Sequence, residues 1–257
     1  MRILKRLGLS ALALLAVAIT VAVLAPAQWL ASALARASDG RVALAEVQGS
    51  FWNGQGTLVL SSKAGSRASL PERLSWRVSP RALLTGRIDA TFSHPSALVQ
   101  PLHVQATPDG KTRVGATTLR LPAIVLVGLG APWNTLRPGG TISVSWNQLL
   151  IDAGRIHGNI IAEWQFASSA MTPVSPFGHY RLQTAGLLPG SQLKLTTISG
   201  PLELAGVGTI SEGGHLRFRG RAQPMSGTDE LVKSQLTGLL SLLGRRDGEA
   251  AILSIGN

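Results

Sequence analysis

The side chains that most often carry out chemistry are few in this chain and lie far apart. The five histidines are His94, His103, His157, His179 and His215. No two of them stand four residues apart, the spacing that places two imidazoles on one helical face to bind a metal ion. We therefore expect each histidine to be solvated or structural, and we expect no metal site.

Nucleophilic and phosphate-binding motifs are also missing from the sequence. It has no Gly-x-Ser-x-Gly, the strained turn that exposes a catalytic serine, and no glycine-rich loop with the lysine that holds a phosphate. The 13 acidic residues are spread along the chain, which leaves open a pair that meets only after folding. The sequence therefore favours a protein that is not an enzyme and binds no cofactor.

Large aromatic residues set beside glycines are the most distinctive local feature. Phe51 and Trp52 stand between glycines in the segment 49–56, and a second tryptophan lies in the segment 74–80. Glycine permits the bulge or tight turn that tips an indole onto a sheet. Such a ring either fills the core or anchors a contact with a partner. The candidate interaction or structural motif comprises Gly49, Trp52, Gly54, Trp76, Pro80 and Gly86.

The elements that must position these residues alternate apolar and polar side chains with a period of two, which is typical of half-buried strands. In one of these stretches, Trp164 and Phe166 are expected to share a face. Frequent glycines and prolines predict turns between the strands. The alternating stretches are 74–78, 142–146, 156–166 and 215–221, and the predicted turns include 108–110, 138–140 and 212–214.

Helical patterns are few. Thr228, followed by two acidic residues, predicts an N-cap, and Gly244 predicts the end of the same helix. Its apolar stripe is expected to comprise Leu231, Leu236, Leu239, Leu240 and Leu243. The short run 123–129 fits either a helix or a buried strand. One helix cannot cover many apolar strand faces, so we expect a mainly β protein whose antiparallel sheet curls or closes on itself.

The first 35 residues have the pattern of a membrane anchor. Three basic residues precede a run from Leu7 to Ala35 that contains no charge. A bilayer is crossed by about 20 apolar residues, so Leu7 to about Leu24 is long enough, and Trp29 would lie at the interface. Basic residues stay in the cytoplasm. We therefore predict a basic start and anchor at 1–35, and a domain at 36–257 across the membrane, in a single-pass protein.

A cleaved signal peptide is the alternative to an anchor. The triplets Ala25-Pro26-Ala27 and Ala33-Leu34-Ala35 both resemble cleavage sites. Signal peptides have shorter apolar cores of roughly 7 to 15 residues, so the length of this one favours an uncleaved anchor.

Charge and cysteine content limit the partners. The net charge is +11, which in a cytoplasmic protein would suggest nucleic acid. Across a bacterial inner membrane the accessible polyanions are lipid head groups, so we expect no nucleic acid, and a plain basic surface is the simpler alternative. The chain has no cysteine, which excludes disulfides and thiolate metal sites.

In its order and spacing of motifs, the chain resembles the protein N component of the type II secretion system. The resemblance rests on Gly-x-x-Trp-x-Gly at Gly49 to Gly54, Leu-x-Trp-x-Val-x-Pro and Leu-Leu-x-Gly-Arg within Leu74 to Arg87, the strand Gly140 to Trp146, the segment Pro176 to Arg181, and a leucine-rich helix ending at Leu243-Gly244. It implies an accessory inner-membrane protein with a periplasmic domain in a Gram-negative bacterium, serving export of folded proteins across the outer membrane. The implied partners are the secretin and the inner-membrane platform proteins.

A different function follows from the predicted sheet alone. Many apolar strand faces with one helix to cover them could curl around lipid, and the basic surplus suits anionic head groups. The sequence therefore leaves a periplasmic lipid-binding or lipid-transfer protein as the alternative. Inner-membrane lipid is a partner on either interpretation, and the oligomeric state is left open.

Overall fold

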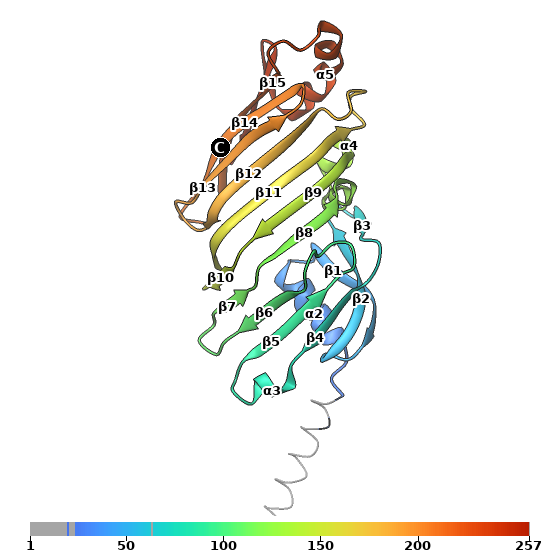
Figure 1. Cartoon of the computed structure of the whole chain (residues 1–257), viewed down its shortest axis with the longest axis vertical. Helices are drawn as coiled ribbons and strands as arrows, with labels where there is room; N and C mark the ends of the chain where they lie inside the picture. The colour runs from blue at the N-terminus through green and yellow to red at the C-terminus, as the bar shows by residue number, and fades with distance from the viewer. Residues whose placement is uncertain (1–19, 21–23, 63, 257) are drawn as a thin grey trace, which may run out of the picture.

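The computed structural model describes residues 20, 24–62 and 64–256. The described chain forms one antiparallel sheet of 17 strands, which are stacked along the long axis of an elongated molecule (Figure 1). Successive strands joined by turns build most of this sheet, as the short alternating segments of the sequence predict. The predicted mainly β, antiparallel fold is confirmed.

The first half of the described chain contains α2 (Gln28–Ala37), β1 (Val42–Gly49), β2 (Asn53–Ser61), β3 (Arg67–Ser69), β4 (Leu74–Val78), α3 (Pro80–Leu83), β5 (Ile88–Ser93), β6 (Leu102–Ala106), β7 (Thr112–Val114), β8 (Thr117–Pro122) and the 3₁₀ helix η1 (Ala123–Leu129). The second half contains α4 (Trp133–Leu136), β9 (Pro138–Trp146), β10 (Leu149–Asp152), β11 (Arg155–Ser169), β12 (Gly178–Leu187), β13 (Gln192–Ser199), β14 (Leu202–Ile210), β15 (Leu216–Pro224), α5 (Glu230–Leu243), β16 (Arg245–Asp247) and β17 (Ala250–Ile255).

Strand pairing follows the order of the chain with few exceptions. β2 pairs with β1, β3 and β4, and the ladder continues through β5 and β6 to β7. β7 and β8 lie end to end beside β10 and β9, which both pair with the long strand β11. From β11 the sheet runs through β12, β13, β14 and β15 to β17 and β16. The sheet is open, because no pairing among the described strands joins β1 to β16.

The N-terminal core lies between α2 and the first strands. Ala27 precedes α2 and is buried with Trp76 and Val78 of β4, while Leu30 of α2 and Leu44 of β1 pack against them. Ala27 and Leu30 allow α2 to pack closely on the sheet, because a helix approaches a sheet closely only where its side chains are small or can interdigitate.

A second core makes the sheet curl. Val125 of η1 belongs to a buried cluster against which Leu60 of β2 and Leu121 of β8 both pack. No pairing among the described strands joins β2 to β8, because the ladder from β2 continues through β4, β5 and β6 to β7. Gly128 of η1 lies so close to β2 that a Cβ atom there would be 2.7 Å from the carbonyl oxygen of Leu60. Side-chain packing through η1, and not strand pairing, therefore bends the N-terminal part of the sheet back toward β8.

The third core lies under the C-terminal helix. Leu236, Leu239 and Leu240 of α5 are fully buried against β11, β12, β14 and β15. The rings of Trp164 and Phe177 meet edge to face there, with centroids 5.5 Å apart. The prediction of one C-terminal helix is thus confirmed, and α5 closes this end of the molecule (Figure 1).

Several local predictions were wrong, each for a physical reason. Phe166 does not share a face with Trp164, because a bulge sets Phe166 at φ +52° and leaves it 71% exposed. The segment 138–140 is not a turn but the start of β9, where proline tolerates the first strand position and Gly140 faces the bulge. The helix cap is Asp229, whose side chain accepts a hydrogen bond from the backbone N–H of Leu231, and Thr228 lies before it.

Other predictions are confirmed or refined. Leu231 is exposed, so the buried stripe of α5 is narrower than predicted. The turns at 108–110 and 212–214 connect β6 to β7 and β14 to β15. The run 123–129, for which the sequence allowed a helix or a strand, is η1.

The predicted anchor from Leu7 to Leu24 lies outside the described residues, apart from Thr20 and Leu24 themselves. Within the described ranges, no helix has the length and apolar character needed for a membrane span. Residues from Ala25 onward pack against the sheet: Ala25 and Ala27 are buried, and α2 lies along β1. The division of the chain at residue 35 stays a prediction.

Candidate interaction site

The candidate motif residues come together mainly around one tryptophan. Trp76 of β4 is 2% exposed, and its indole N–H points at the backbone carbonyls of Ser50 and Phe51, each 3.2 Å away. Gly54 pairs with Trp76 across the β2–β4 ladder. A Cβ atom at Gly54 would lie 2.9 Å from Cε2 of the Trp76 ring, so only glycine leaves room for the indole.

The turn between β1 and β2 completes this cluster. Gly49 has φ +93° at the end of β1, a conformation that glycine adopts without strain. Phe51 and Trp52 meet edge to face at 5.2 Å between ring centroids, and both pack against the N-terminal core. The structure therefore brings Gly49, Trp52, Gly54 and Trp76 into one place, where Trp76 is a core residue.

Pro80 and Gly86 frame a separate feature, which we call the tip and define as residues 80–88. Pro80 is the first residue of α3, and Gly86 ends the following turn at φ +69°. Between them the tip exposes Leu83 and Leu84, and the latter is 88% exposed. Sequence reasoning placed these leucines in a motif but not among the site residues. The signal that could have identified them is an apolar pair in a turn bounded by proline and glycine.

Hydrogen bonds connect the tip with the point where the described chain enters the sheet. The N–H of Phe51 donates to the carbonyl of Ala25 at 2.8 Å, and the N–H of Val78 donates to the carbonyl of Trp52 at 2.7 Å. Ser79, which precedes the tip, donates its N–H to the carbonyl of Asp89 at 2.8 Å. The tip and the chain entry therefore belong to the same end of the molecule, the lower end in Figure 1.

A small network of ionisable side chains lies on β11 and β12. Arg181 lies 2.7 Å from a carboxylate oxygen of Glu163, and His179 Nε2 lies 3.6 Å from the other oxygen. Hydrogen bonding from Gln165 and from Arg181 lowers the pKa of Glu163. A carboxylate held ionised by an arginine is suited to fixing strand register and not to taking up a proton.

His94, at the end of β5, is the one buried histidine of the described chain. Its Nδ1 accepts a hydrogen bond from the N–H of Ala97 at 3.0 Å, and its Nε2 has no hydrogen-bond partner. Burial lowers the pKa of His94, and Glu72 partly opposes this. In the described residues no three His, Cys, Asp or Glu side chains are placed to hold a metal ion.

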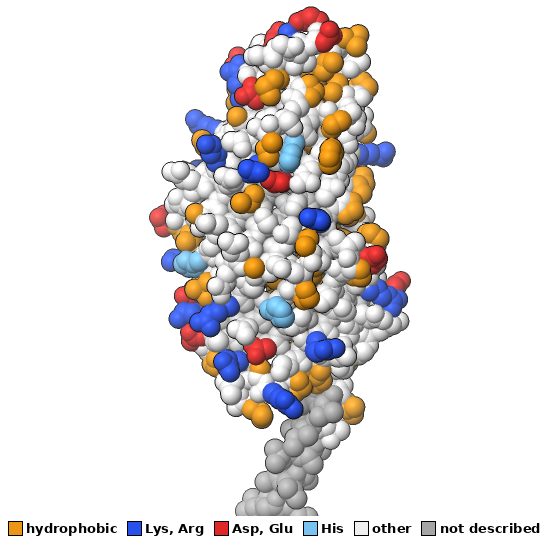
Figure 2. All heavy atoms as spheres, viewed as in Figure 1, with side chains coloured by type: hydrophobic (Ala, Val, Ile, Leu, Met, Phe, Trp, Pro, Cys, Tyr) orange, Lys and Arg blue, Asp and Glu red, His pale blue; other side chains and the backbone are white. Residues whose placement is uncertain are grey.

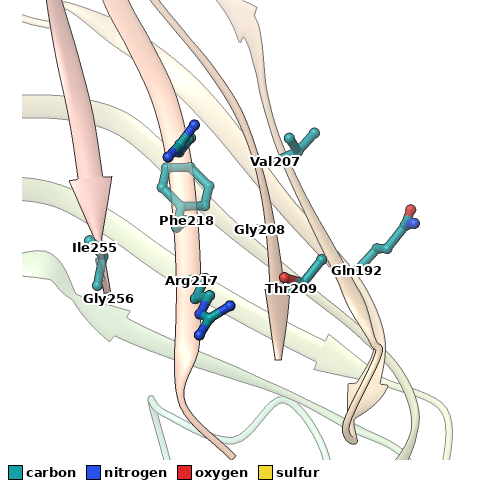
Figure 3. Close-up of a pocket in the computed structure, with 9 residues that line it drawn as sticks. Gln192, Val207, Gly208, Thr209, Arg217, Phe218, Ile255 and Gly256 are labelled. Carbon is teal, nitrogen blue, oxygen red and sulfur yellow. The ribbon is translucent and has the colours of Figure 1, made fainter. Parts of the chain in front are cut away.

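A cavity of about 730 Å³ opens where β13, β14, β15 and β17 lie side by side (Figure 3). Phe218 and Ile255 supply its apolar part, and Arg217 and Arg219 supply positive charge. The ring of Phe218 lies over glycines of the paired strands: a Cβ atom at Gly208 would be 3.0 Å from its Cδ2. The cavity therefore combines apolar surface with guanidinium groups, and it contains no acidic side chain.

The register also builds an apolar surface in the middle of the sheet. Val144 of β9, Ala162 of β11 and Leu182 of β12 are paired in one row, so their side chains share a face. The central apolar face comprises Ile142, Val144, Trp146, Ile160, Ala162 and Leu182, which are half-buried and lie in none of the three cores.

The other face of these strands is polar. Ser143, Glu163 and Arg181 form the next row across the same strands. Figure 2 shows one face of the molecule, on which charged and histidine side chains are scattered among backbone atoms and uncharged side chains.

Comparison with known proteins gives one match. No curated protein and no solved structure matches this chain significantly. A family model, type II secretion system protein N, matches residues 40–253, which include every strand from β1 to β16 and most of β17. The match covers well over half of the chain, and the chain therefore belongs to the type II secretion system protein N family.

Proposed function

We propose that this protein is a non-enzymatic accessory component of type II secretion whose periplasmic domain works through contacts, held at the inner membrane by its N-terminal segment. Membership of the family gives the accessory role in secretion. The anchor, the periplasmic location and the contact mechanism are the proposed part. The main support is the open sheet, which extends away from the end where the chain enters it (Figure 1).

Both ends of the sheet are suited to binding another protein. Among the described strands, β1 pairs only with β2 and β16 only with β17. An edge strand has unpaired N–H and C=O groups to which a partner can add a strand. We propose the secretin and the inner-membrane platform proteins as partners at these edges.

Packing of the first described residues supports an uncleaved anchor. Ala25 and Ala27 are buried, and Leu30 of α2 packs in the core around Trp76. Cleavage after Ala35 would remove most of α2 and uncover this core. A chain that keeps these residues keeps the preceding apolar segment attached, and the family's role in secretion agrees with a place in the envelope.

Crosslinking in the native envelope tests the contact mechanism. A photoreactive residue is placed at Ala45 on β1 or at Arg245 on β16, and the control position is Gln105, which is exposed on β6 between two paired strands. We expect secretin or platform peptides to be captured from an edge position and not from Gln105. Equal capture from all three positions, or no secretion component from any, would refute docking at the edges.

A deletion strain tests the role in secretion itself. We expect exported proteins to accumulate in the periplasm while the rest of the envelope stays intact. Unchanged export would refute a required role in secretion, whatever the crosslinks show.

A second function, lipid binding, is favoured by the central apolar face. A half-buried apolar surface with a polar face behind it is what a lipid carrier needs. We propose an acyl chain as the occupant of this face.

The lipid proposal is tested with a photoreactive residue at Val144 in the full-length protein in its native envelope. Ser145 is the matched control, because it is the next residue on β9 and faces the opposite side of the sheet. Lipid adducts at 144 and not at 145 support the proposal, and an absence of adducts at both positions, or equal adducts, argues against it.

A further inference from the structure

The tip has the composition of a membrane-surface contact. Leu83, Leu84 and Ile88 are exposed in the same short turn, and Arg81 and Arg87 stand within it. Residues 80–88 contain no acidic side chain, and neither arginine forms an ion pair with another described residue. Apolar side chains flanked by arginines are typical of segments that lie in the interface of an anionic bilayer.

The exposed leucines are held outward by a hydrogen-bonded turn. The N–H groups of Leu84 and Gly86 donate to the carbonyls of Arg81 and Leu83, at 3.2 and 2.9 Å. Ala82 is buried, and its carbonyl closes the turn by accepting from the N–H groups of two later tip residues, at 3.0 Å each. Leu84 is therefore presented to the surroundings by the fold, and nothing else in the described chain covers it.

The position of the tip agrees with such a contact. The predicted anchor ends at about Leu24, next to Ala25, where the described chain begins to pack. Ala25 is linked to the strand before the tip through Phe51, Trp52 and Val78. In Figure 1 the tip, marked by α3, lies at the same end of the long axis as this chain entry. Leu24 and Trp29, near the entry, are also exposed apolar residues.

We propose that the tip docks onto the surface of an anionic bilayer, with Leu83 and Leu84 in the boundary between head groups and acyl chains and with Arg81 and Arg87 on lipid phosphates. The inference rests on the proposed membrane segment for its position, and it adds a second contact with the same membrane. Two contacts fix the tilt of the sheet relative to the bilayer, which a single contact does not do.

The absence of cysteine allows a direct test. Full-length Leu84→Cys protein carrying an environment-sensitive dye is reconstituted in vesicles of phosphatidylcholine and phosphatidylglycerol that contain lipids with brominated chains. The control is Leu231→Cys, a position that is also an exposed apolar residue but lies on α5, at the other end of the molecule in Figure 1. We expect a blue shift and strong quenching at 84 and neither at 231. Emission at 84 like that at 231 overturns the proposal.

A third label separates this inference from the proposed anchor. Ser10→Cys lies within the apolar run, so a spanning segment predicts quenching there. Quenching at 10 without quenching at 84 refutes the tip contact alone. Quenching at 84 without quenching at 10 supports the tip contact and refutes the anchor, and quenching at neither refutes both.

Charge reversal tests the role of the arginines. An arginine near an anionic surface contributes about 1 kcal/mol, so Arg81→Glu and Arg87→Glu should each lower the ratio of docked to undocked tip by at least roughly fivefold. Arg81→Lys should retain docking, and vesicles of phosphatidylcholine alone should weaken it. If quenching at 84 changes neither with the Arg→Glu substitutions nor with the removal of phosphatidylglycerol, recognition of anionic lipid is refuted. A label at 84 that is shielded in native envelopes but unquenched in these vesicles indicates a protein partner and overturns the proposal.

Discussion

The indole of Trp76 lies on the backbone of Gly54, one strand away, and this contact joins the β1–β2 turn to the rest of the sheet. The same indole donates its N–H toward the carbonyls of Ser50 and Phe51. Trp76, on β4, therefore packs against β2 and also hydrogen-bonds to the β1–β2 turn. No side chain larger than a hydrogen atom fits at Gly54. The aromatic and glycine motif of the sequence is therefore a packing unit.

Removing this packing should destabilise the protein. Trp76→Ala empties a fully buried site, which typically costs about 3 to 5 kcal/mol, and Gly54→Ala should also lower stability because it displaces the ring. Gln55→Ala is the matched control, since Gln55 is exposed on the same strand. Urea unfolding of the three variants measures the difference. Stability close to wild type in Trp76→Ala, together with weaker partner capture, would instead make this tryptophan a contact residue.

The cap of α5 gives a sharper comparison of two adjacent residues. Asp229 accepts the N–H of Leu231 at 2.8 Å, whereas Thr228 donates its hydroxyl to the carbonyl of Pro201 at 3.4 Å. Loss of an N-cap side chain costs about 1 kcal/mol. Asp229→Ala should therefore be less stable than Thr228→Ala in thermal or urea unfolding. The opposite order would restore Thr228 as the cap.

His94 should make stability depend on pH. An unfolded histidine has a pKa near 6.5, while burial lowers the pKa of His94 in the folded protein. Between the lowered pKa and about 6.5 the unfolded chain therefore binds more protons, so the free energy of unfolding falls as pH drops through this range. Glu72 favours the charged form and reduces the effect.

The test replaces the imidazole with a neutral acceptor. In His94→Asn the side-chain oxygen can still accept the N–H of Ala97, but the group no longer titrates. We expect melting temperatures of this variant to fall less than those of the wild type from pH 7.5 to 5.5, approximately. His215→Asn, at an exposed histidine, is the control. Identical pH profiles for wild type and His94→Asn would contradict the prediction.

Local patterns in the sequence were sufficient to predict the strands β4, β9, β11 and β15 and the C-terminal helix, because alternation and leucine spacing report which side of an element is buried. Phe166 shows where this fails: the bulge at φ +52° is set by the partner strand and Gly140, and not by the residue itself. The curl of the sheet depends on Val125 of η1, which meets β2 only in the folded chain. Distant packing of this kind leaves no local periodicity.

The candidate site was predicted only in part for a similar reason. Glycine beside tryptophan indicates close packing, so the cluster of Gly49, Gly54 and Trp76 was accessible from sequence. The exposure of a side chain could not be predicted from sequence in the same way. Leu84 has the sequence pattern of a core leucine, and its exposure follows only from the turn in which the folded chain places it. The motif residues Pro80 and Gly86 frame that exposed turn.

The central apolar face yields a last prediction, which separates lipid binding from simple packing. Val144 pairs with Leu119 of β8 and Ala162 of β11, and its half-buried side chain lies in none of the three cores. A charge there should remain partly solvated, so Val144→Glu should fold with a modest loss of stability. If lipid occupies this face, the charge must enter an apolar contact, and lipid recovered with the protein should fall sharply. Ser145→Glu, on the polar face, should leave lipid recovery unchanged. Equal lipid recovery from wild type and Val144→Glu would mean that this face binds no acyl chain, and a large loss of stability in Val144→Glu would show instead that the residue belongs to a closed core.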